Sequence, residues 1–524
     1  MQPMQKGSSS SLTSATWNEA LDRAAAVLQA AGGDVAALAG AGLSNEDAWT
    51  LRQVVEAASG SRLGAWPPLL HGGQALVAQV GVGTGTNLGK LGLRRRYPDC
   101  RGNTWKEEAR YGVCASSRPH DRGAFVVVAN AARHTRMDDF SSEQPRYATG
   151  KAAEWLRDIR QEQQALAARL AEANNLVIVA GAEGLTLEGS TALMQAAANL
   201  LIESGHYGKP QNGLIGVFPG ANAMGLHYTG FSPEAAQSIV EKPPKVLIVA
   251  QADVTGDDPD AAKWLGKVEH IITLTLWPDD VASRATVAMP ITSFAERDGS
   301  YTNGERRVQR YYTAQGPVGE AEPAWRALSR LVERMGKGRA KQSAAAVMLE
   351  MTQQIPAFAG SRYSELAKVE RQFPEVGGTD LYYGGTAYKN KGGLGVQVAT
   401  TAEQGETVAT AEVAIPKIVH HRGDLWVVPT TVLYNRAPDF QPSVLERMEA
   451  RVPEAYVEIN AADAEKLALK DGEYVQVSIG DDTVRARARV NGAAPKGSIL
   501  LPRHLSGEVT PLSLTQGSVT KIGG

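Results

Sequence analysis

The sequence predicts an α/β protein in which two doubly wound, Rossmann-like parallel-sheet domains precede a small β-barrel. The chain of 524 residues is too long for a single core. Buried, β-branched segments alternate with amphipathic helical segments, which is typical of a parallel sheet covered on both faces. Short alternating segments bounded by glycine or proline follow near the end and are typical of a barrel. We expect α/β domains at 1–150 and 151–340, an irregular connection at 341–440 and the barrel at 441–524.

Capping signals place the first helices. Thr16 precedes an amphipathic segment and has Glu19 three positions later, which predicts a capped helix. Ser44 starts a second helix, with acidic residues in its first turn. Buried strands are predicted at 34–39 and 125–130.

The middle of the chain repeats this alternation. A charged helical segment at 150–174 leads into a strand at 174–186, and a further helix follows it. Strands at 246–253 and 270–277 flank a helix at 260–268. Helices between buried strands predict parallel crossover connections.

Composition excludes several classes of function. The chain is 43% hydrophobic and 21% charged, with a net charge of −2. A nucleic-acid binder would need a concentrated basic surface, so no nucleic-acid partner is expected. No apolar run approaches the roughly 20 residues that span a bilayer, and the first residues lack the apolar core of a secretory signal. We expect a soluble cytoplasmic protein with no direct membrane span.

No catalytic or metal-ligating set is recognisable. Cys100 and Cys114 are the only cysteines, so a four-cysteine zinc site or iron–sulfur cluster cannot be built within this chain. The adjacent His420 and His421 would point to opposite faces of a strand. No serine-hydrolase, zinc-protease or kinase signature is present, so we assign no catalytic residue and no metal ligand.

Two glycine-bearing turns are candidates for cofactor binding. The turn that begins at Gly181, and the segment 213–225 with Gly220 and Asn222, could present backbone amides to a phosphate. Neither matches a complete dinucleotide or P-loop fingerprint. The alternative is structural, because tight turns between strands and helices need glycine in any case. Asn222 could equally cap its own turn.

The segment 294–310, FAERDGSYTNGERRVQR, is crowded with charged and polar residues. It follows a buried strand that ends in proline, so we expect it at the carboxyl edge of a sheet, where open α/β proteins bind ligands. Glu296, Asn303 and Gln309 are the candidates for a polar, polyanionic ligand. The alternative is a salt-bridged loop between domains.

Residues 93–120 do not fit the pattern around them. They contain Arg94, Arg95 and Arg96 and both cysteines, where a doubly wound unit needs a buried strand and a helix. One hypothesis is that 93–120 is read in a shifted frame. The alternative is a genuine basic insertion, and resequencing the gene would decide between them.

The segment 294–309 resembles a family pattern, E-x-x-G-[ST]-Y-x-N-x-E-x-R-x-Q, found in molybdopterin-dependent oxidoreductases of the dimethyl-sulfoxide-reductase type. More specifically, it is similar to the carboxyl-terminal region of the large iron–sulfur subunit of the bacterial NADH:quinone oxidoreductase, respiratory complex I. The segments TWNEAL, SNEDAWTLRQVV, VGTGTNLG, NLVIVAGAEGLTLEG, FPGANAMG and ATVAMP, with VEINAADAEKLALKDGEYVQV near the end, agree in order.

The resemblance implies a scaffold portion of complex I, an assembly that passes electrons from NADH to quinone and couples this to ion translocation. It implies no cofactor in this chain and iron–sulfur clusters in a region amino-terminal to it. The chain alone would then not be catalytic. The implied partners are the other peripheral-arm subunits and a cluster-binding upstream part, at the inner face of the plasma membrane. Two alternatives stay open, a subunit that binds a molybdopterin cofactor and a nucleotide- or anion-binding module.

Overall fold

The chain forms two compact units, each assembled from segments distant in sequence. The first comprises Met1–Gly85, Tyr207–Thr255 and Asp260–Val408, and the second Thr86–His206, Gly256–Pro259 and Ala409–Gly524. The computed structural model describes residues 2–6, 12–86, 124–131, 135, 137–181, 185–366, 395–417, 424–437, 449–508, 510 and 512–522. Residues 93–120, with Cys100, Cys114 and the three arginines, lie outside these ranges, and so do His420 and His421.

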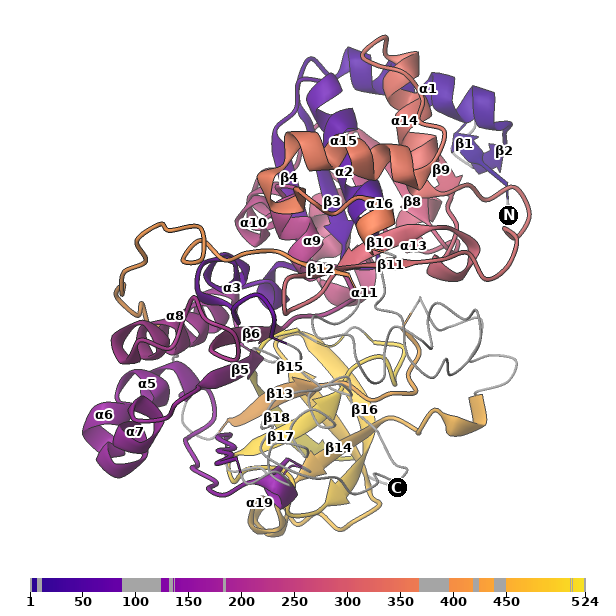
Figure 1. Cartoon of the computed structure of the whole chain (residues 1–524). Helices are drawn as coiled ribbons and strands as arrows, with labels where there is room; N and C mark the ends of the chain where they lie inside the picture. Colours follow the sequence, from indigo (N-terminus) through magenta and orange to yellow (C-terminus); the bar gives the residue numbers. More distant parts are fainter. Residues whose placement is uncertain are drawn as a thin grey trace, which may run out of the picture. The chain divides into compact units, whose positions relative to one another are not determined.

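A seven-stranded sheet forms the centre of the first unit, in the order β2-β1-β9-β8-β7-β3-β4 (Figure 1). Strands β9, β8, β7, β3 and β4 pair in parallel, whereas β1 and β2 add an antiparallel edge. The bounds are β1 (Met4–Lys6), β2 (Leu12–Ser14), β3 (Val35–Gly40), β4 (Arg62–Trp66), β7 (Val246–Ala250), β8 (His270–Thr275) and β9 (Val287–Pro290). The sheet therefore combines strands from both segments that the sequence predicted to be α/β.

Helices cover both faces of this sheet, because successive residues of a strand point to opposite sides. Val35, Ala37 and Ala39 pack into one hydrophobic core, and Ala36 and Leu38 pack into the other. The helices of the first unit are α1 (Trp17–Ala30), α2 (Asn45–Ala57), α3 (Gln74–Val80), α9 (Ala223–Tyr228), α10 (Pro233–Glu241), α12 (Ala261–Leu265), α13 (Asp280–Arg284), α14 (Ala324–Arg334), α15 (Ala344–Gln354) and α16 (Tyr363–Leu366).

The remaining strands of the first unit lie outside this sheet. They are β6 (Gly213–Val217) and a three-stranded antiparallel sheet, β10 (Gly299–Thr302), β11 (Arg307–Tyr311) and β12 (Val396–Gln397). The short 3-10 turns are η1 (Pro68–Leu70), η4 (Phe294–Glu296) and η5 (Pro356–Phe358). Helix α11 (Val254–Asp257) begins in the first unit and ends in the second.

The second unit contains a closed six-stranded barrel, in the order β13-β17-β14-β16-β15-β18. Its strands are β13 (Leu425–Thr430), β14 (Tyr456–Ile459), β15 (Tyr474–Ile479), β16 (Asp482–Val490), β17 (Ser498–Pro502) and β18 (Thr515–Lys521). The rest of the unit has η3 (Asp138–Phe140), α5 (Ala152–Arg157), α6 (Ile159–Glu162), α7 (Gln164–Ala171), β5 (Val177–Gly181), α8 (Leu187–Ser204), η7 (Glu449–Arg451) and α19 (Ala461–Lys466).

The predicted fold class, α/β with a parallel-rich sheet followed by a β-barrel, is confirmed. Two local predictions differ from the structure. The helical segment 150–174 forms three short helices, α5, α6 and α7. The strand expected at 125–130 makes isolated bridges only, Val127 with Glu143 and Asn130 with Arg146. The domain boundaries at residues 150, 340 and 440 stay a prediction.

Both predicted helix caps are present. The Thr16 side chain accepts from the Glu19 amide, and the Glu19 carboxylate accepts from the Thr16 amide, which completes a capping box. Ser44 and Asp47 form the equivalent box at the start of α2, with distances of 2.9 and 3.0 Å. These reciprocal bonds satisfy amides that the first helical turn leaves without partners.

A buried ion pair joins α2 to the β10–β11 hairpin. Asp47 Oδ2 lies 2.9 Å from Arg297 Nη1, and both side chains are fully buried. Asp47 Oδ1 also accepts a hydrogen bond from the Trp325 amide at 2.7 Å. Burial by itself lowers the pKa of an arginine, but Asp47 together with Tyr311 and Tyr301 raises the pKa of Arg297 above its ordinary value. One carboxylate therefore holds the starts of α2 and α14 and the hairpin together.

Glu46, which precedes Asp47 in α2, is buried, and none of the cations that the structure describes pairs with it. Its carboxylate accepts from the Ser300 amide at 2.9 Å, from Ser300 Oγ at 2.8 Å and from the Tyr363 hydroxyl at 2.9 Å. Burial raises the pKa of Glu46 from 4.5 to about 7, although these hydrogen bonds oppose the shift. Glu46 is therefore a second attachment between α2 and the hairpin, and its proton occupancy changes near neutral pH.

In the part of the chain that the structure describes, none of the helices has the length and apolar character needed to cross a membrane.

Replacing Arg297 should weaken this arrangement severely. In Arg297→Met, the Asp47 carboxylate stays buried without its cation, which typically costs about 3–5 kcal/mol. We expect the amides of α2 to exchange with solvent much faster, as measured by hydrogen exchange and mass spectrometry. The matched control is Arg334→Met, because the Arg334–Asp22 pair is solvent-exposed and should contribute no more than about 1 kcal/mol. Equal effects of the two substitutions would contradict the role given to Arg297.

Glu46 should make stability depend on pH. Between pH 4.5 and about 7 the folded state keeps a proton that the unfolded state has lost, so the free energy of unfolding should fall as pH rises through this window, by on the order of 3 kcal/mol. Urea unfolding from pH 4.5 to 8 measures this slope. Glu46→Gln should flatten it, whereas Glu241→Gln, at an exposed glutamate of α10, should leave it unchanged. An unchanged slope in Glu46→Gln would refute the assignment.

Candidate active-site crevice

The strand order of the first unit reverses direction between β3 and β7. From β3 the chain continues to β4 on one side, whereas β7 is followed by β8 and β9 on the other. Loops that leave two adjacent parallel strands toward opposite sides open a crevice at their carboxyl ends, and open α/β proteins bind ligands there. We call the ends of β3 and β7, with the loops that follow them, the switch-point crevice.

Two glycines let the loops of this crevice approach closely. A Cβ at Gly40 would lie only 1.7 Å from the Gln251 carbonyl oxygen, so no side chain fits there. A Cβ at Gly42 would lie 3.2 Å from Gln251 Oε1. Gln251 has a φ of 49°, in the left-handed region. The backbone N–H of Gln251 donates a hydrogen bond of 2.9 Å to the Leu274 carbonyl.

Gln251 Oε1 is buried and accepts no hydrogen bond from any residue that the structure describes. A buried amide oxygen without a donor typically costs about 1–3 kcal/mol, and such atoms in a crevice are suited to a ligand N–H or O–H group. Gln251 Oε1 is therefore an acceptor on these loops that a ligand N–H or O–H group would satisfy.

Asn222 and Gly220, two of the predicted binding residues, lie beside the crevice as structural elements. Asn222 is fully buried, and its side chain donates to the Leu43 carbonyl at 2.9 Å and accepts from the Thr302 amide at 2.7 Å. Its own amide donates to the Ala41 carbonyl at 3.0 Å. A Cβ at Gly220 would lie 2.6 Å from the Ala41 side chain. These two residues shape the loop after β3, and the polar side-chain atoms of Asn222 already have partners in the protein.

Of the three candidates from the charged segment, Glu296 and Asn303 accept hydrogen bonds from the protein itself, and Gln309 is exposed. Glu296 accepts from Ser293, at 2.8 Å from both the amide and the hydroxyl, and from the Val318 amide at 2.8 Å. Asn303 Oδ1 accepts from two backbone amides of its own turn, each at 3.0 Å. Gln309 is exposed and lies opposite Tyr301 in the hairpin.

Other charged groups of this segment also bond within the unit. The buried Arg306 guanidinium donates to the carbonyls of Val82 and Val398 at 2.6 and 3.2 Å, and Arg297 pairs with Asp47. These two arginines therefore make contacts within one unit, whereas the structural alternative expected a salt-bridged loop between domains.

Tyr301 brings the hairpin to the crevice. Its hydroxyl donates to the Gly42 carbonyl at 3.2 Å, and its ring packs on Tyr311 with centroids 4.6 Å apart. Burial raises the pKa of both tyrosines above the ordinary value, so both hydroxyls stay neutral at physiological pH. The hairpin therefore contributes a neutral aromatic wall.

The predicted binding residues are divided between the two units. Gly181 ends β5 in the second unit, and residues 182–184 lie outside the described ranges. The assignment of the predicted residues to cofactor binding stays a prediction.

Sequence reasoning missed Gly40, Gly42, Gln251 and Tyr301. Gly40 and Gly42 come just after the strand predicted at 34–39, and Gln251 lies within the strand predicted at 246–253, but only the observed strand order shows that these segments meet.

The second unit has a cavity of its own, of about 320 Å³. Helix α8, whose first turn is capped by Thr186, borders it, as does Trp426 of β13. The lining residues are Gly150, Ala153, Glu154, Leu185, Thr186, Gly189, Ile415, Pro416, Lys417, Trp426, Leu514, Thr515 and Gln516. The lining combines apolar side chains with few charges, as is common in small-molecule pockets.

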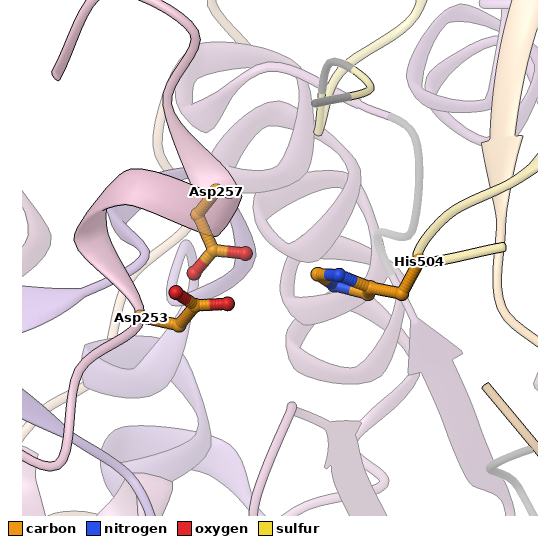
Figure 2. Close-up of side chains that lie close together, drawn as sticks. All are labelled: Asp253, Asp257 and His504. Carbon is orange, nitrogen blue, oxygen red and sulfur yellow. The ribbon is translucent and has the colours of Figure 1, made fainter. Parts of the chain in front are cut away.

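Two groups of the second unit, Asp257 and His504, are drawn in Figure 2. Asp257 Oδ1 accepts from Arg503 at 2.7 Å. Burial, together with the nearby Arg503, lowers the pKa of His504 to about 3, so its imidazole stays neutral. Asp253, also drawn, belongs to the first unit, and we assign no metal site to the three side chains.

Two family models match this chain. A molybdopterin oxidoreductase model matches residues 1–334, and a molydopterin dinucleotide binding domain model matches residues 441–523. The chain is 26% identical over 359 residues to the F420-dependent formate dehydrogenase 2 subunit alpha of Methanococcus maripaludis, covering 60% of this chain and 52% of that protein. It is 26% identical over 381 residues to the NADPH-Fe(3+) oxidoreductase subunit alpha of Geobacter sulfurreducens, covering 66% of this chain and 41% of that protein.

The chain thus spans about half the length of the curated relatives that it matches. Among solved structures, acetylene hydratase from Pelobacter acetylenicus has the same fold, with a TM-score of 0.64 at 13% identity over 99% of this chain and 92% of that chain.

These matches correct one prediction. The expectation that this chain contains no cofactor is wrong, because the models that match both its α/β part and its barrel describe molybdopterin domains. The absence of a complete cysteine set, on which that expectation rested, does not bear on a pterin, which proteins can bind through hydrogen bonds. The chain belongs to the molybdopterin oxidoreductase family.

Proposed function

We propose that this chain is part of a molybdopterin-dependent oxidoreductase and binds part of the cofactor in the switch-point crevice. The observation that carries this proposal is the buried, unpartnered Gln251 Oε1 at the reversal of strand order. It lies within the residues that the molybdopterin oxidoreductase model matches.

The residues of the crevice fit such a group. Pterin and guanine rings present N–H and amino donors at their edges, which an amide oxygen can accept. Gly42 places no side chain beside this oxygen, and Gly40 places none beside the backbone carbonyl of Gln251, which leaves these loops suited to a flat polar ring. Tyr301 is neutral and aromatic, which suits contact with a conjugated ring.

When bound, the cofactor supplies the oxidation–reduction chemistry, and the protein supplies binding, orientation and the surrounding electrostatics. In this proposal Gln251 orients the ring by accepting a hydrogen bond. Asn222 holds the loop after β3 in place, because it bonds to Ala41 and Leu43. Independently of the crevice, the cavity of the second unit is a separate candidate for binding a dinucleotide. Leu514, Thr515 and Gln516, which line that cavity, fall within the match to the dinucleotide binding domain.

Substrate and partners are further proposals. Relatives named as formate dehydrogenases and NADPH-Fe(3+) oxidoreductases make formate and NADPH the first substrates to test. Because the chain has only two cysteines, it cannot bind a cluster through four cysteines of its own. We therefore propose that electrons leave through a cluster that these 524 residues do not supply by themselves.

A second candidate is a subunit of a NADH:quinone oxidoreductase at the inner face of the membrane. The pattern at 294–309 and the order of the other sequence segments favour it. The two candidates predict different electron donors and acceptors, so activity assays with formate, NADPH, and NADH with quinone would separate them.

Cofactor content tests the main proposal. We expect the chain purified from molybdenum-replete cells to contain pterin, measured by fluorescence of its oxidised form, and molybdenum, measured by mass spectrometry. Gln251→Leu removes the acceptor, so retained pterin should fall about tenfold, as expected for the loss of one buried hydrogen bond.

The matched control is Gln353→Leu, because Gln353 is exposed on α15. This variant should retain as much pterin as the unmodified chain. A folded chain without pterin would contradict the proposal, and equal pterin in the Gln251 and Gln353 variants would contradict the role of Gln251.

A further inference from the structure

The first unit has a second hollow, of about 290 Å³, beyond the carboxyl end of α2. Helices α2, α14 and α15 lie side by side around it (Figure 1). We call it the basic hollow, and its lining residues are Gln53, Glu56, Ala57, Ser329, Val332, Lys337, Gly338, Arg339, Lys341 and Glu350. Ala57 at the end of α2 lies ten residues after Asp47, so the rise of the helix separates the two by about 15 Å.

The carboxylates of the basic hollow are already neutralised. Glu350 pairs with Lys341 and accepts a hydrogen bond from Gln53. Glu56 pairs with Arg52 at 2.7 Å. The acidic residues of the lining therefore do not repel an anion.

Lys337 and Arg339 supply uncompensated positive charge. Both side chains are exposed, and no described acidic residue lies within ion-pair distance of either. They lie on either side of Gly338, on the segment that follows α14. An anion entering the hollow would meet both cations.

The backbone around these cations is fixed. Gly336 has a φ of 71° after the end of α14, and the Lys337 amide donates to the Val332 carbonyl at 3.1 Å. On the far side, the Lys341 amide donates to Ser329 Oγ at 3.0 Å. A segment held at both ends loses little freedom on binding, which favours affinity.

We propose that the basic hollow binds a small phosphate-bearing molecule that also carries hydroxyl groups. Arg339 can bond two phosphate oxygens at once, and Lys337 adds a point charge. Gln53 and Glu56 offer polar atoms to hydroxyl groups on the wall. The volume is at the lower end of small-molecule pockets, which fits a metabolite of sugar-phosphate size.

Isothermal titration of the full chain tests this site, with ribose 5-phosphate as the probe and inorganic phosphate and ribose for comparison. We expect ribose 5-phosphate to bind, ribose not to bind, and inorganic phosphate to bind more weakly. Hydrogen exchange of a peptide covering 336–341 should slow when ribose 5-phosphate is present. Affinity should fall about tenfold or more in the double variant K337Q/R339Q.

The matched control is K267Q/R284Q, which removes the same charge from two exposed cations elsewhere in the first unit. It should bind ribose 5-phosphate like the unmodified chain. Equal losses of affinity for ribose 5-phosphate in the two double variants would indicate non-specific electrostatic attraction and overturn the proposal. The absence of binding at millimolar ribose 5-phosphate would also overturn it. Tighter binding of a hexaglutamate peptide than of ribose 5-phosphate would overturn the assignment to a small molecule.

Discussion

The buried pair between Asp47 and Arg297 is the interaction on which the first unit most depends. It joins the start of α2 to the start of α14 and to the β10–β11 hairpin, which both lie far from α2 in sequence. A buried pair of this kind is not in itself strongly stabilising, but the loss of either partner is costly. It therefore fixes which segments meet, and the hairpin must lie against α2.

The position of the hairpin determines the shape of the switch-point crevice. Tyr301 reaches the Gly42 carbonyl, and the Thr302 amide binds Asn222, which in turn binds the loop after β3. The polar residues of this region mostly bond to the protein itself. Gln251, like Glu305 of the charged segment, has a buried side-chain oxygen that lacks a donor among the described residues. The charged segment at 294–310 thus contacts the loop after β3 through Tyr301 and through the bond between Thr302 and Asn222. The proposed ligand acceptor, Gln251 Oε1, lies on the loop after β7.

Local features of the sequence predicted local structure well. The Thr16 and Ser44 caps and the buried β7 strand follow from side chains within a few residues. The apolar segment 125–130 did not form the expected strand, because a strand also needs a partner with a matching edge. Gln251 could not be identified as a site residue, since its importance depends on the order of strands far apart in sequence. The resemblance indicated the superfamily, but the inference that this chain has no cofactor was wrong.

The central claim is that Gln251 contacts the molybdopterin group, and a density map of the cofactor-loaded protein tests it most directly. We expect ring density beside Gly40 and Gly42, with a ring N–H or amino group within hydrogen-bond distance of Gln251 Oε1. Density for the whole cofactor elsewhere, with Gln251 Oε1 bonded to protein or open to solvent, would contradict the account.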